Sequence, residues 1–225
     1  MAVINDPSVA THIGRVGEVA TSSLGAQHIT LKPIPSSVGV YRVTHRCAII
    51  ATQAANSRLF ELRNTHATNL LILTALRIRW LQVAAHTAAI EDSLDYVKVT
   101  GFTVVDDTDT VTLTGSIKRF GMAAAPGSAL IRGATVAGVA AGMTGGTLVE
   151  DAAPFAQLPA WLLAAVPTAA VTPFVLDDVL GDDPATYPFV FAQNEGFIIK
   201  NRVLLGAAAG SSVYIDCQYV EATAY

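Results

Sequence analysis

The chain has 225 residues, enough to bury a substantial core without disulfide bonds or a metal ion. Hydrophobic residues make up 52% of it and charged residues only 14%, against roughly 25% in typical globular domains, so we expect much of the surface to lie against other subunits. The net charge of −4 argues against nucleic acid as a partner, because phosphate binding needs clustered Lys and Arg.

The first 24 residues are polar and weakly periodic, which predicts an N-terminal arm over residues 1–24 and a single domain over 25–225. No signal peptide is visible at the N-terminus. The window between Asp151 and Asp177 has no charge and is long enough to span a bilayer. Its prolines would repeatedly break a helix, so we expect a soluble protein with no membrane partner.

Strand patterns begin after the arm. In the clearest of them, Leu76, Ile78 and Trp80 alternate with two arginines, as expected when one face is buried and the other is wet. The polar link 106–109 joins two strand patterns and suggests a hairpin, while the Ala-rich stretch 83–94 is a helix candidate or a loop. The predicted strands are residues 38–50, 59–63, 70–82, 97–105, 111–117, 189–191, 196–201, 203–205 and 213–221.

The middle of the chain, residues 122–188, is rich in Ala, Gly and Pro and has weaker strand patterns. We interpret it as long loops or an elaborated insertion on the domain. Within it, residues 159–166 suggest a short helix with proline at the first position. Near the C-terminus, residues 206–212 resemble a hairpin loop between two strands. The last strand should place Val213, Ile215 and Tyr219 on one face.

Strands at this spacing, with no amphipathic helices between them, favour an all-β fold. We predict an antiparallel β-sandwich of the jelly-roll type with an N-terminal arm and a long insertion. Cys47 and Cys217 permit one disulfide at most, and we expect both to be free, buried thiols.

Searches for a catalytic site find little. The glycine run 138–146 has no lysine to hold a phosphate, and no nucleophile elbow occurs. The five histidines never fall at the short spacings of metal sites. Glu91, Asp92 and Asp95 could supply the paired carboxylates of a glycosidase, but a solvated loop explains them better. The sequence therefore predicts that the protein is not an enzyme and needs no cofactor.

Calcium is the one cofactor that the sequence leaves open, because two groups of aspartates crowd short segments, and oxygen-rich loops bind this ion. Aspartate is also a common turn residue, which is the simpler explanation. The two groups are Asp106, Asp107 and Asp109, and Asp177, Asp178, Asp182 and Asp183.

Arg77 and Arg79 could bind an anionic partner or pair with carboxylates on a neighbouring strand, and pairing is the simpler interpretation. An apolar group in the charge-free segment could form an interface with another subunit, because exposed apolar clusters and Trp mark interfaces. Burial on the chain's own sandwich is the equal alternative. The group is Phe155, Leu158, Trp161, Leu162 and Leu163.

Three stretches resemble virion structural proteins of tailed bacteriophages: residues 56–64 with the strand that follows them, 192–201, and 206–210 with the closing strand. The resemblance covers about half of the chain. It implies a jelly-roll-like head decoration (cement) protein or a collar, tail or fibre component, located in the virion and assembled in the host cytoplasm. We expect a homo-oligomer, a trimer, that clamps neighbouring capsid or tail subunits. The alternatives are a receptor- or glycan-binding module and a β-rich hydrolase.

Overall fold

A computed structural model describes residues 37–85, 88–113, 117–119, 129–135, 137–138, 140–164, 174–178, 189–204 and 210–224. These residues belong to one unit, Ser36–Tyr225. The arm predicted over residues 1–24 lies outside the described residues. Within the described residues, all regular structure is β-strand, and no helix could cross a membrane.

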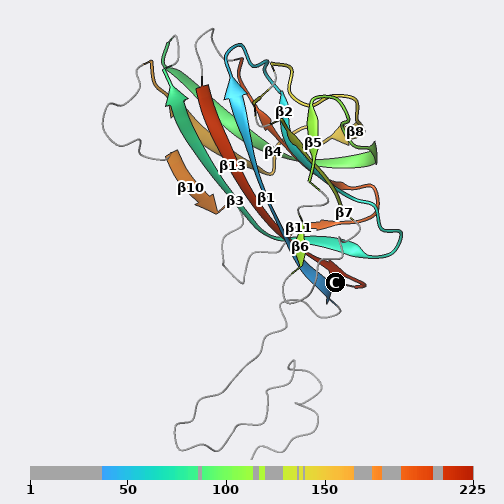
Figure 1. Cartoon of the computed structure of the whole chain (residues 1–225). Helices are drawn as coiled ribbons and strands as arrows, with labels where there is room; N and C mark the ends of the chain where they lie inside the picture. The colour runs from blue at the N-terminus through green and yellow to red at the C-terminus, as the bar shows by residue number, and fades with distance from the viewer. Residues whose placement is uncertain are drawn as a thin grey trace, which may run out of the picture. The chain divides into compact units, whose positions relative to one another are not determined.

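The strands form two antiparallel sheets that pack together as a β-sandwich, which confirms the predicted fold class (Figure 1). Sheet A has the order β10-β3-β13-β1-β6, and β11 also pairs with β3. Its strands are β1 (Ser37–Ile50), β3 (Leu70–Ala84), β6 (Lys118–Arg119), β10 (Phe174–Asp178), β11 (Phe189–Phe191) and β13 (Gly210–Ala222).

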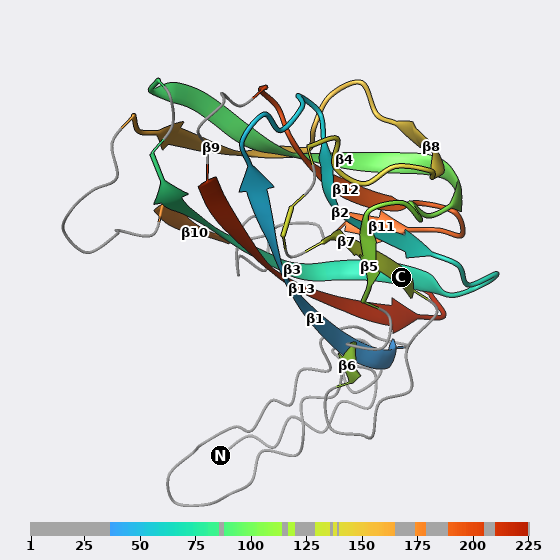
Figure 2. The same cartoon turned by 45° about the horizontal axis from the view of Figure 1, so that its top comes forward.

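Sheet B has the order β5-β7-β2-β12-β4-β8, and β9 also pairs with β4. Figure 2 shows this sheet behind the long strands of sheet A. Its strands are β2 (Arg58–Asn64), β4 (Ile90–Val104), β5 (Thr110–Thr112), β7 (Ala129–Ala134), β8 (Thr147–Glu150), β9 (Ala156–Leu162) and β12 (Gly196–Asn201).

The main core lies between the sheets and is built from alternate residues of their strands. On β3, Leu76, Ile78 and Trp80 are fully buried, as the alternating pattern predicts. The same holds for the predicted row on β13, where Val213 and Tyr219 are fully buried. A smaller apolar cluster that includes Val97, Phe102 and Ile198 packs on the other face of sheet B.

Two predicted hairpins are wrong. The strand at 110–112 pairs with β7 and not with β4, and Val111 is 37% exposed. Residues 203–204 are not in a strand, and β12, the strand before them, lies in a different sheet from β13. Residues 206–209 of the predicted loop, and residue 205 before it, lie outside the described residues. Both errors have one cause: neighbours in sequence were assumed to be neighbours in a sheet.

Neither of the two helix candidates is a helix in the described residues, although the described part of the link between β3 and β4 within 83–94 agrees with the alternative of a loop. The stretch 83–94 contains the end of β3 and the start of β4, and residues 159–162 belong to β9. The predicted insertion at 122–188 instead supplies β7, β8, β9 and β10 to the two sheets. Alanine has the highest intrinsic helix propensity, but intrinsic propensity is a weak preference, and pairing with neighbouring strands overrides it here.

Both cysteines are buried and free. Cys217 lies opposite Val43 and Cys47 lies opposite Val213, four residues further along the paired strands. That offset corresponds to about 13 Å, whereas a disulfide needs Cα atoms within about 7 Å. The expectation of free thiols is confirmed.

Candidate functional site

Four arginines gather on the outward face of sheet A, on strands β1 and β3 with β13 between them. On β1, Arg42 and Arg46 alternate with buried residues and are exposed. On β13, Tyr214 lies directly opposite both Arg46 and Arg79, and Asp216 lies directly opposite Arg77. Directly opposite residues share a face of the sheet, so the register alone places these side chains together.

The residues line an open hollow of about 530 Å³, which we call the arginine hollow. Arg42 donates hydrogen bonds to the carboxylate of Asp216, which raises the pKa of the Arg42 guanidinium. The guanidinium carbon of Arg46 lies 5.6 Å from the centre of the Tyr214 ring, within the range of a cation–π contact. Arg46 also donates a hydrogen bond of 3.2 Å to Ser212 Oγ.

Among the described side chains that line the arginine hollow, four arginines stand against one carboxylate, Asp216, which is bound by Arg42. Arg79 is exposed and makes no hydrogen bond or ion pair with the described residues. Arg77 is partly buried, and its register partners are Asp216 of β13 and Asp178 of β10. Arg46 and Arg79, on the two strands that flank Tyr214, therefore have no carboxylate partner among the described residues and remain open to an anion.

Sequence reasoning found only Arg77 and Arg79 of this site. Arg42, Arg46 and Tyr214 were missed because they lie on strands far away in the chain. The alternation of exposed arginines with buried residues along 41–49 was the available signal. That alternation points to a shared site only once the register shows that β13 lies between β1 and β3.

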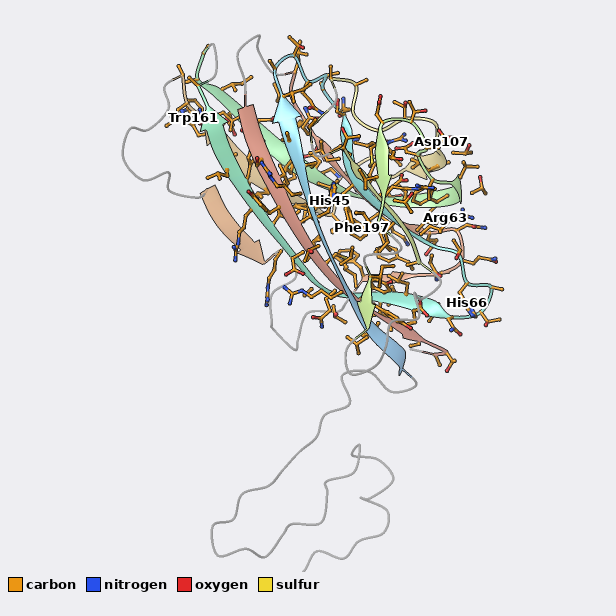
Figure 3. All side chains as sticks on the ribbon, viewed as in Figure 1. His45, Arg63, His66, Asp107, Trp161 and Phe197 are labelled. Atoms are coloured by element: carbon orange, nitrogen blue, oxygen red, sulfur yellow. The ribbon has the colours of Figure 1, made fainter. Side chains whose placement is uncertain are left out.

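The predicted interface group is divided by β9, where buried and exposed residues alternate. Leu158 and Leu162 face the core, with 3% and 0% exposed, and Phe155 packs partly buried against it. Trp161 is 53% exposed and lies at the periphery of the sandwich, whereas Phe197 lies at its centre (Figure 3). Leu163, just after the strand, is partly buried. Trp161 is thus the most exposed member of the group, and Leu158 and Leu162 are unavailable to another subunit.

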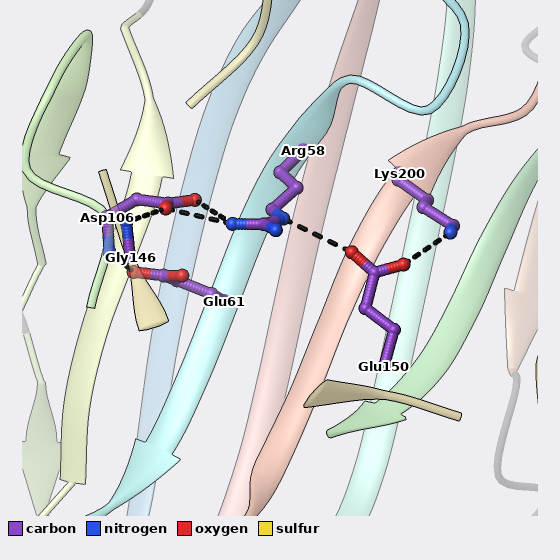
Figure 4. Close-up of polar contacts among 6 residues, drawn as sticks. All are labelled: Arg58, Glu61, Asp106, Gly146, Glu150 and Lys200. Atoms are coloured by element: carbon purple, nitrogen blue, oxygen red, sulfur yellow. Dashed lines mark hydrogen bonds and ion pairs between the residues drawn. The ribbon is translucent and has the colours of Figure 1, made fainter. Parts of the chain in front are cut away.

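Asp106 of the first aspartate group is fully buried in an ion-pair network (Figure 4). Its carboxylate accepts hydrogen bonds from Arg58 and from the backbone N–H of Gly146. Arg58 also lies 3.4 Å from Glu150, which is paired with Lys200. The network joins β2, β8, β12 and the segment after β4, so Asp106 has a structural task.

The carboxyl group of Glu61, fully buried beside this network, accepts a hydrogen bond from the backbone N–H of Asp106. Burial and the neighbouring carboxylate of Asp106 raise its pKa to about 8. Protonated Glu61 is the form that this environment stabilises at neutral pH.

No group of three metal-ligating side chains occurs within the described ranges. Asp107 and Asp109 lie in the turn after β4, and Asp109 has a positive φ of 59°. In the second aspartate group, Asp177 and Asp178 belong to β10 and not to a loop. Asp182 and Asp183 lie outside the described residues.

The trio Glu91, Asp92 and Asp95 belongs to β4 and is not a solvated loop. Asp92 accepts hydrogen bonds from the backbone N–H groups of Ser93 and Val203, and burial raises its pKa to about 6. Asp95 accepts hydrogen bonds from Ser93 and Gln157, whereas Glu91 is exposed. The two buried carboxylates connect β4 to β9 and to the end of β12.

Two of the five histidines are described. His45 lies between the sheets with Nε2 2.8 Å from the carbonyl oxygen of Ala134, and burial lowers its pKa. His66 shapes the turn after β2, where its Nδ1 accepts hydrogen bonds from the N–H groups of Thr68 and Asn69. Both imidazoles serve local structure.

The sequence shows no significant match to any protein-family model or to any curated protein.

Proposed function

We propose that the sandwich is a jelly roll. In that topology eight strands pair in nested order: first with last, second with seventh, third with sixth and fourth with fifth. The described strands support this order: β1 pairs with β13, β2 with β12, β3 with β10 and β11, and β4 with β8 and β9. On this assignment β5, β6 and β7 are additions between the fourth and fifth strands.

We infer from the nested strand pairing that the protein is a non-catalytic structural component of a virion. Viral capsid domains are a common use of the jelly roll. The low charge and the structural roles of the buried carboxylates support the same reading. The resemblance to tailed-bacteriophage proteins implies that the protein is a component of the head decoration, collar, tail or fibre. Its partners are copies of itself, in a trimer, and the major capsid or other virion proteins.

Trp161 is the proposed centre of a subunit interface. Large exposed aromatic side chains commonly anchor interfaces. The edge of β9 is a poor site for adding a strand, because Pro159 lacks the N–H group that a new strand would bind. Contact through the outward side chains of β9 is therefore the favoured mode.

The test compares Trp161→Ser with Leu162→Ala, neighbours on β9 with opposite burial. Trp161→Ser should lower the native mass measured by light scattering and leave the melting temperature of the protomer nearly unchanged. Leu162→Ala removes a buried side chain and should lower the free energy of unfolding by about 2–5 kcal/mol. An unchanged native mass in Trp161→Ser would refute the interface.

A second candidate function is receptor or glycan binding, because lectins also use the jelly roll. The arginine hollow is the observation that favours it. The two functions use different surfaces: Trp161 is on sheet B, and the arginine hollow is on sheet A. One virion protein could perform both.

A further inference from the structure

Tyr214 lies between Arg46 and Arg79 in the strand register of the arginine hollow. Arg46 on β1 and Arg79 on β3 both lie directly opposite Tyr214 on β13. Neighbouring strands are about 4.8 Å apart, so the Cα atoms of the two arginines are about 10 Å apart. Tyr214 is 40% exposed between them. A ligand here would meet an aromatic side chain with a positive charge on each side.

The charges select an oxyanion. A guanidinium group forms paired hydrogen bonds with carboxylate, sulfate or phosphate oxygens, and such charge-assisted bonds are the stronger kind. Arg79 has no partner among the described residues, and Arg46 contacts only the Tyr214 ring and a serine hydroxyl within them. Neither guanidinium needs to break an ion pair with a described carboxylate in order to bind.

The volume of the arginine hollow and the net charge of the chain favour a short ligand over a polymer. The hollow of about 530 Å³ is within the usual range for small-molecule sites, roughly 300–1,000 Å³. Nucleic acid needs a track of basic residues along many phosphates, and the chain has a net charge of −4. The excess of positive charge in the hollow is local and would attract one or two anionic groups.

The aromatic and polar groups suit a sugar ring. The Tyr214 side chain offers an apolar surface on which the C–H groups of a saccharide can pack. Thr44 and Asp216 line the same hollow and can bond to hydroxyl groups. We propose that the arginine hollow binds an acidic saccharide, with Arg46 and Arg79 on its carboxylate or sulfate group and Tyr214 against its ring.

The test is a calorimetric titration of the full chain with three acidic probes: sialyllactose, trigalacturonic acid and a sulfated heparin disaccharide. At least one should bind, whereas lactose, the neutral counterpart, should not. Arg79→Ala and Tyr214→Ala should each weaken that binding by about tenfold or more. Tyr214→Phe, which keeps the ring, and Arg132→Ala, which removes a partly buried arginine of sheet B, should bind as the parent does.

Two further probes, inorganic sulfate and an oligothymidylate, test whether the hollow instead binds a simple oxyanion or nucleic acid. Sulfate that binds as tightly as the saccharides, with no loss in Tyr214→Ala, would reduce the site to an oxyanion site and overturn the proposal. Tighter binding of the oligothymidylate would assign the hollow to nucleic acid instead. The proposal would also be overturned if none of the three acidic saccharides binds. Trp161→Ser should leave the titration unchanged, so this result is independent of the subunit interface.

Discussion

At the scale of single residues, Glu61 links stability to pH. Its pKa is raised to about 8 in the folded chain, because it is buried and lies next to Asp106, whereas the pKa of an unfolded glutamate is about 4.3. Between those values the folded state binds a proton that the unfolded state releases. The free energy of unfolding should therefore fall as pH rises across this window, and the contribution is fully present only below it.

Glu61→Gln removes the titrating group and keeps a side-chain oxygen for the N–H of Asp106. We expect it to be more stable than the parent near pH 9 by at least about 1 kcal/mol, or about 2–4 °C in melting temperature. Near pH 5 the difference should largely vanish. Melting curves at both pH values check this, with exposed Glu91→Gln as the control. An equal shift at both pH values would refute the account.

The sequence could predict which apolar residues face the core but not which charged residues are buried. Trp80 and Tyr219 follow a period of two that can be read locally. Buried Asp106 accepts hydrogen bonds from Arg58 and from the backbone N–H of Gly146, and its own N–H donates to buried Glu61, so each partner lies 40 to 48 residues away in the chain. Partners so far away in the chain cannot be predicted from the local alternation of apolar and polar residues.

At the scale of elements, buried and exposed residues alternate along β9 as in a typical strand. Its alanines and its proline hide that alternation in the sequence. Leu158, Ala160 and Leu162 face the core, and the residues between them face outward. Alanine and a leading proline suggested a helix, yet seven register pairs with β4 fix the segment as a strand. Pairing partners could not be predicted either, because nested pairing joins strands that are far apart in the chain.

The β1–β13 register gives a direct test of this pairing. Val43 lies directly opposite Cys217, so Val43→Cys places two thiols at a Cα separation compatible with a disulfide. Mild oxidation should remove two free thiols, as measured by thiol titration after denaturation. The parent chain is the control, because its own cysteines are offset by four residues and should stay free. Three free thiols in the oxidised variant would contradict the register.

At the scale of the whole molecule, two sheets supply two different outer surfaces. Sheet A has the arginine hollow, and an edge strand of sheet B presents Trp161. The sequence predicted the sandwich and singled out Trp161, Arg77 and Arg79. It could not show that the hollow combines β1, β3 and β13, since that depends on the order of strands in the sheet.

The native mass of the unmodified chain in dilute solution tests the central claim, assembly into a virion component, most directly. Light scattering after size exclusion should give three times the chain mass of 23.5 kDa, because a surface with so little charge needs neighbours to cover it. Adding EDTA should leave that mass unchanged. A chain that stays monomeric at every concentration tested would contradict the account.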